Sequence, residues 1–155
     1  MTNNIENKLS ELGIELPTVA APVAAYIPAQ KSGNLIFTSG QLPMRDGALV
    51  ATGILGVDIE VEDAYACARQ CALNALAAIK AIVGDLDKVT RIVKVTGFVA
   101  SHPTFTNQPA VVNGASELLG QVFGDLAPHA RSSIGMAVLP LNAPVEIELI
   151  VEVAD

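Results

Sequence analysis

Cysteines, cationic residues and long apolar runs are all scarce in this chain of 155 residues, and each scarcity excludes a class of protein. Two cysteines are too few for a disulfide scaffold. Nine lysines and arginines against 16 acidic residues leave a net charge of −7, which has the wrong sign for an electrostatic nucleic-acid binder. No run of 18 or more apolar residues is present, so no membrane span is predicted.

The N-terminal segment and the two cysteines both favour a reducing compartment. The segment is polar and has no apolar stretch of the kind that a signal peptide needs, so we expect a cytoplasmic protein. Cys67 and Cys71 are spaced to share one face of a helix. Because neither His102 nor His129 is near them in the sequence, we interpret them as buried thiols and predict no metal site.

The composition predicts one folded domain. Hydrophobic residues make up 51% of the chain and charged residues 16%, which supports a substantial core in a chain of this length. No internal repeat or change of composition marks a second domain. Residues 1–155 are therefore expected to form a single domain, in which residues 1–20 are an N-terminal helical extension.

Hydrophobic periodicity predicts the order of the elements. Apolar residues recur at helical spacing over residues 3–12, 60–83 and 109–123, with Asp58 as a candidate N-cap of the second helix and Gly84 as its end. Apolar runs or alternation predict strands over residues 24–29, 35–39, 48–51, 89–100, 131–139 and 145–153. The main order ββαβαββ favours an α+β two-layer sandwich with the helices on one face of the sheet.

The last two predicted strands are expected to pair as an antiparallel hairpin, because a short proline-bounded link joins them. In residues 131–139 the row of Ile134, Met136 and Val138 is expected to face the helices, and Arg131 to face the opposite side. A pairing of Val138 with Val145 would leave Arg131 and Glu146 roughly 20 Å apart at about 3.3 Å per residue. If the two residues share a site, one of them must come from a neighbouring subunit.

Several segments of the chain, taken in order, match a known pattern. The run Ala130-Arg131-Ser132-Ser133-Ile134, followed by Leu139-Pro140 and Val145-Glu146-Ile147, resembles the C-terminal signature of the RidA (YjgF, L-PSP) family. Tyr26, the run Leu35-Ile36-Phe37-Thr38-Ser39-Gly40-Gln41-Leu42-Pro43 and the run Lys94-Val95-Thr96-Gly97-Phe98-Val99 are similar to family segments in the same order. The resemblance extends over residues 24–153.

The resemblance implies a fold, an assembly and an activity. The fold is chorismate-mutase-like, and the assembly is a homotrimer whose sheets form an inner barrel with sites in the clefts between subunits. The activity is deamination: the hydrolysis of reactive imines and enamines, such as 2-iminopropanoate and 2-iminobutanoate, to 2-keto acids and ammonia. No metal or organic cofactor is required, because a protonated imine is already a good electrophile.

The resemblance also assigns roles to individual residues. Arg131 is expected to hold the substrate carboxylate, since a guanidinium donates two parallel hydrogen bonds to such a group. Glu146 is expected to position or activate water. The remaining cleft residues implied by the resemblance are Tyr26, Ser39, Gly40, Asn113 and Ser133.

Departures from the family pattern leave other functions open. Ser133 stands where many relatives have a cysteine, and His129 stands where the signature has proline or alanine. One alternative is an endoribonuclease or translation inhibitor, which the negative charge disfavours. Another is a non-catalytic oligomer that binds small carboxylates or acts as a chaperone.

Overall fold

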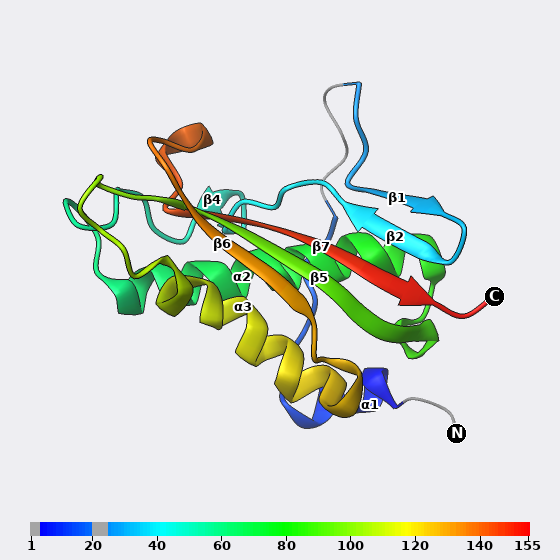
Figure 1. Cartoon of the computed structure of the whole chain (residues 1–155). Coiled ribbons are helices and arrows are strands. Elements are labelled where there is room, and N and C mark those ends of the chain that lie inside the picture. Colours follow the sequence, from blue (N-terminus) through cyan, green and yellow to red (C-terminus); the bar gives the residue numbers. More distant parts are fainter. Residues whose placement is uncertain (1–3, 20–24) are drawn as a thin grey trace.

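The structure is a computed structural model that describes residues 4–19 and 25–155. Its elements in chain order are α1 (Ile5–Glu11), β1 (Ala29–Ser32), β2 (Leu35–Thr38), β3 (Met44–Arg45), β4 (Ala48–Leu49), α2 (Val61–Val83), the 3₁₀ turn η1 (Leu86–Lys88), β5 (Val89–Ala100), α3 (Gln108–Phe123), η2 (Gly124–Leu126), β6 (Ala130–Met136), η3 (Pro140–Asn142) and β7 (Val145–Val153) (Figure 1). The predicted order ββαβαββ is confirmed for the main sheet and the two long helices. The predicted starts at residues 3 and 24 lie outside the described residues.

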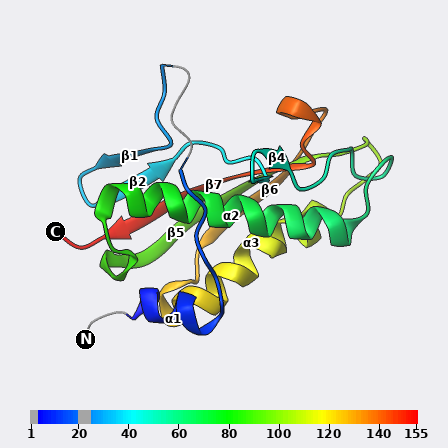
Figure 2. The same ribbon diagram turned by 180° about the vertical axis from the view of Figure 1, so that it is seen from behind.

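The main sheet has five strands in the order β1-β2-β7-β5-β6. All neighbours are antiparallel except β5 and β6, which are parallel. Helices α2 and α3 lie together on one face of this sheet, as Figures 1 and 2 show from opposite sides. The expected two-layer α+β sandwich is therefore confirmed. The sheet is open, and the residues that the structure describes form no closed barrel.

Helix α2 packs closely against its neighbours because many of its side chains are small. Its alanines and both cysteines are mostly buried, which lets the helix lie close to β7 and to α3. By length and composition α2 is the one described helix that could cross a membrane, but 61% of its apolar stretch is buried inside the fold. The buried core helix of a soluble fold has the same length and composition, so this result is weak evidence for a membrane span.

Gly114 lies where α3 packs closely against α2. A Cβ atom added there would collide with the backbone carbonyl oxygen of Tyr65 in α2, and backbone atoms cannot move aside cheaply. We expect Gly114→Ala to lower the free energy of unfolding by about 1–3 kcal/mol through overpacking. Gly120→Ala is the control on the same helix, because no atom lies within 4 Å of its added Cβ. It should stabilise by about 0.5–1 kcal/mol. Equal effects of the two changes in urea unfolding would contradict this account of the helix contact.

The first strand and the cap of α2 differ from prediction. β1 begins at Ala29 rather than spanning residues 24–29, and its hairpin with β2 turns over only two residues, with Gly33 at a φ of +59°. Asp58 does not cap α2, since the helix begins after Glu60. The Asp58 carboxylate instead accepts a hydrogen bond from the backbone N–H of Ile54, which closes the preceding loop.

The predicted hairpin between the last two strands is wrong. β5 lies between β6 and β7 and pairs with both, so the link through Pro140 crosses over a strand instead of making a tight turn. The facing of β6 is also the reverse of the prediction. Arg131 pairs with buried Val95 and therefore lies on the helix side, whereas Ile134 is 44% exposed on the open side.

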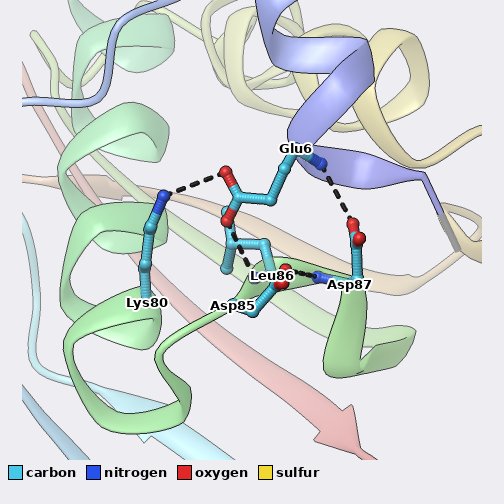
Figure 3. A network of polar contacts seen from close by, with 5 residues as sticks. All are labelled: Glu6, Lys80, Asp85, Leu86 and Asp87. Atoms are coloured by element: carbon cyan, nitrogen blue, oxygen red, sulfur yellow. Dashed lines mark hydrogen bonds and ion pairs between the residues drawn. The ribbon is translucent and has the colours of Figure 1, made fainter.

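The N-terminal helix α1 is attached to the core by both apolar and polar contacts. Ile5 and Leu9 are buried, which confirms a helix in this segment. Figure 3 shows the polar contacts: the Glu6 carboxylate accepts hydrogen bonds from Lys80 Nζ at 2.9 Å and from the backbone N–H of Leu86 at 3.0 Å, and the Glu6 N–H donates to the Asp87 carboxylate. A cavity of about 390 Å³ beside this helix contains none of the predicted site residues.

Candidate functional site

Arg131 is held by side chains of α3. Its Nη1 atom donates to Asn113 Oδ1 at 2.8 Å and to Ser116 Oγ at 3.2 Å. Residues three apart on a helix share a face, so α3 presents both acceptors to the strand beside it. Arg131 itself is half-buried and lies on the edge strand β6. The guanidinium is therefore oriented by the fold and is not a loose surface charge.

The rest of this guanidinium is available to a ligand. Among the described residues, Nη2 and Nε of Arg131 donate to no partner, and no carboxylate lies within ion-pair distance of the group. A cation without a protein counter-ion favours an anion from solution, and the fork of donors matches the geometry of a carboxylate. Arg131 thus has the features of a carboxylate clamp.

Ser133 lies on the same face of β6 as Arg131, two residues further along. Its hydroxyl oxygen is buried and has no hydrogen-bond partner among the described residues. A buried hydroxyl without a partner carries an uncompensated desolvation cost. This location agrees with the expectation that Ser133 sits beside Arg131.

The unpartnered Ser133 hydroxyl predicts an unusual mutational result. Ser133→Ala removes a polar atom without breaking a hydrogen bond, so we expect the free energy of unfolding to rise by about 1 kcal/mol or stay unchanged. The control is Ser101→Ala, because the buried Ser101 hydroxyl donates to the Val99 carbonyl at 2.7 Å. That change should destabilise by about 1 kcal/mol. A clear loss of stability in Ser133→Ala in urea unfolding would show that the hydroxyl has a partner.

Glu146 belongs to a different group of residues, on the open face of the sheet. It pairs with Phe98 of β5 and lies over Gly40, where an added Cβ would collide with the carboxylate. Gly40 therefore leaves the space that the Glu146 side chain occupies. Desolvation by burial raises the pKa of Glu146, and the negative charge of Glu148 raises it further. A carboxylate of raised pKa accepts a proton more readily at neutral pH.

Ser39 directly precedes Gly40 in the chain, and its contact with Ile27 brings the segment of Tyr26 next to Ser39. The Ser39 hydroxyl donates to the Ile27 carbonyl at 2.6 Å, which ties the segment after β2 to the segment before β1. Tyr26 immediately precedes Ile27 and is 63% exposed. Because the Ser39 hydroxyl already has a partner, we interpret it as a group that stabilises the local backbone next to Gly40.

Five of the seven predicted site residues thus fall into two groups within one chain. Asn113, Arg131 and Ser133 lie where α3 meets the helix side of β6, and Glu146 with Gly40 lies on the open side of the sheet. The structure does not bring Arg131 and Glu146 together within one chain. The expectation that they do not meet within one chain agrees with the structure, but the hairpin spacing behind it is wrong: the two side chains are on opposite faces of the sheet.

Two residues extend the Arg131 group beyond the prediction. Ser116 was not expected at the site, although its spacing from Asn113 on a predicted helix is a usable signal. His129, noted in the sequence only as a departure from the family signature, contacts Ser116 Oγ through Nε2 at 2.9 Å and the Ala127 carbonyl through Nδ1 at 2.6 Å.

The other candidate groups are separate from both clusters. His102 is exposed and bonds locally to Thr104. Cys67 and Cys71 are both free and buried, and burial raises the pKa of each thiol, which lowers its reactivity. Within residues 4–19 and 25–155 no three histidine, cysteine or acidic side chains gather as metal ligands.

Comparison with known proteins identifies the family. The sequence profile described as "YjgF/chorismate mutase-like, putative endoribonuclease" matches residues 6–153. The chain belongs to the RidA/YjgF family. The family match covers both groups of site residues and confirms the resemblance seen in the sequence.

Three known proteins are similar to this RidA/YjgF chain over nearly its whole length. Protein TCP17 of Trypanosoma cruzi is 43% identical over 152 residues, which cover 97% of this chain and 95% of TCP17. A 2-iminobutanoate/2-iminopropanoate deaminase of Dermatophagoides farinae is 32% identical, over 89% of this chain and 93% of the deaminase. The crystal structure of Atu1372 from Agrobacterium tumefaciens, a protein of unknown function, superposes with a TM-score of 0.90 at 48% identity and covers 99% of this chain and 95% of Atu1372.

Proposed function

We propose that this protein hydrolyses reactive 2-imino and enamine acids to 2-keto acids and ammonia, in clefts between the subunits of a homotrimer. The observation that carries the proposal is the Arg131 guanidinium, which α3 orients through Asn113 and Ser116 and which keeps donors free for a carboxylate. A relative with 32% identity is named as a 2-iminobutanoate/2-iminopropanoate deaminase, which supports the same substrate class.

The chemistry needs only a clamp and a base. Arg131 binds the substrate carboxylate and fixes the C=N carbon in the cleft. A water molecule attacks the carbon of the protonated C=N group as one of its protons passes to the Glu146 carboxylate, and the electrons of the double bond move to the nitrogen, which gives a neutral carbinolamine. Glu146 then returns that proton to the amino nitrogen. The C–N bond breaks with its electrons on nitrogen, so that ammonia leaves, and the hydroxyl group loses its proton to solvent as the keto group forms.

A cleft between two subunits would bring Arg131 and Glu146 together. Because their side chains lie on opposite faces of one sheet, a single chain supplies Arg131 to a site at one face and Glu146 to a site at the other face. In a cyclic trimer every cleft then combines Arg131 of one subunit with Glu146 of the next. The open face also exposes large apolar side chains that an inner barrel would cover, among them Phe37, Ile134 and Met136.

The test is the release of keto acid and ammonia from 2-imino acids that a second enzyme generates in the assay. We expect the purified protein to speed the appearance of 2-oxobutanoate beyond the spontaneous rate. Binding of 2-oxobutanoate in calorimetry without any acceleration would instead identify a non-catalytic carboxylate-binding protein. If the same preparation cleaves RNA and Arg131→Ala loses that activity, the protein is instead a ribonuclease.

A further inference from the structure

His129 lies one hydroxyl group away from the guanidinium of Arg131. The guanidinium donates to Ser116 Oγ at 3.2 Å, Ser116 Oγ contacts His129 Nε2 at 2.9 Å, and His129 Nδ1 contacts the Ala127 carbonyl oxygen at 2.6 Å. Ser116 and His129 are both half-buried, so these contacts are partly shielded from water. The three contacts form one continuous chain from Arg131 to the backbone of the segment before β6.

The direction of each hydrogen bond follows from the groups involved. A carbonyl oxygen only accepts, so His129 Nδ1 carries the hydrogen, and in the neutral imidazole Nε2 is then an acceptor. The Ser116 hydroxyl therefore donates to Nε2 and turns its lone pairs toward Arg131. Every bond in the chain points the same way, from guanidinium to hydroxyl to imidazole to carbonyl, and such an arrangement is mutually reinforcing.

We propose that His129 is a positioning residue for Arg131, which acts by fixing the Ser116 hydroxyl as an acceptor for the guanidinium. This inference rests on the proposed function, in which Arg131 binds the substrate carboxylate. With Nη1 anchored by Asn113 and Ser116, the other donors of the guanidinium are held ready for the carboxylate. Pre-organising a binding group in this way lowers the cost of ordering it when the substrate arrives.

Two conservative variants separate positioning from a purely structural role. The amide oxygen of glutamine reaches the place of Nε2, so His129→Gln keeps an acceptor for Ser116 but loses the donor to Ala127. The amide of asparagine reaches only the place of Nδ1, so His129→Asn keeps the donor to Ala127 and loses the acceptor for Ser116. A positioning role needs the first contact, and a role in fixing the local backbone needs the second.

We expect His129→Asn to raise the KM for the imino acid by about 3–10-fold with kcat nearly unchanged, because it removes the neutral hydrogen bond that fixes the Ser116 hydroxyl in front of the Arg131 guanidinium. His129→Gln should keep the KM within about 2-fold of the parent protein. In a Ser116→Ala background the KM values of the two variants should no longer differ, because the hydroxyl that links His129 to Arg131 is gone. The opposite pattern, with rescue by asparagine and not by glutamine, would overturn the proposal.

An NMR measurement tests the positioning of Arg131 without relying on enzymatic activity. The guanidinium ¹⁵N and ¹H signals of Arg131, assigned by their loss in Arg131→Lys, report rotation about the Cζ–Nη1 bond. We expect slower rotation in the parent protein and in His129→Gln than in His129→Asn. Equal rotation in all three would refute positioning even if the enzyme is active. If the signals follow the prediction but no imino acid is hydrolysed, the proposed function fails while the role of His129 stands.

Discussion

Arg131→Ala is expected to lower kcat/KM for 2-iminobutanoate by about 100-fold or more, because it removes two charge-assisted hydrogen bonds to the substrate carboxylate. Arg131→Lys keeps the charge but not the planar fork of donors, so it should recover only a small part of the loss. The measurement is steady-state release of keto acid, together with the oligomeric state of each variant in solution.

The control for this change is Arg91→Ala. Arg91 is an exposed arginine of β5 that pairs across the sheet with Glu152, away from α3. Its replacement removes the same charge from the same protein and should leave the rate within about 2-fold, as a surface change does. If Arg91→Ala and Arg131→Ala lower the rate equally, overall charge and not the clamp determines the activity.

Glu146→Gln is expected to lower kcat by about 100- to 10,000-fold, since an amide cannot accept the proton of the attacking water. The raised pKa of Glu146 also makes a pH prediction. The active form is the carboxylate, so activity should fall as the pH decreases through a midpoint that lies above the usual pKa of glutamate. Glu146→Gln should abolish that part of the pH–rate profile.

Glu148→Gln is the matched control for the pH effect. The Glu148 charge raises the pKa of Glu146, so its removal should lower that pKa and move the midpoint to lower pH while the rate at neutral pH is kept. Because the folded state disfavours the ionised Glu146, Glu146→Gln should in addition stabilise the protein at neutral pH. A midpoint that does not move in Glu148→Gln would show that another group controls the profile.

Strands with regular alternation were predictable from the sequence, and strands without it were not. Residues 145–153 alternate between buried apolar and partly exposed polar side chains, and residues 89–100 are rich in β-branched residues, so both strands have the predicted bounds. β6 has apolar residues on its open side and Arg131 on its helix side. Hydrophobicity alone therefore assigned its faces in reverse, since it does not distinguish an apolar row that faces the helices from one that is exposed on the open side of the sheet.

The candidate site was predictable only in part, for a similar reason. Arg131 and Asn113 were expected from the resemblance, and the structure places them in contact. Ser116 and His129 join them through α3 and the segment before β6, and a hydroxyl or an imidazole has no periodic signature in a sequence. The interposition of β5 between β6 and β7 is a long-range pairing, which the short link between the two strands concealed.

The central claim is that Arg131 and Glu146 act in one site although they come from different chains, and subunit mixing tests it most directly. Arg131→Ala and Glu146→Gln chains are each nearly inactive alone. Co-expressed in equal amounts, they should assemble so that about a quarter of the clefts contain both native residues, and keto-acid release should recover to about a quarter of the parent rate. A mixed protein as inactive as either variant, with trimers that contain both chains, would contradict the shared site.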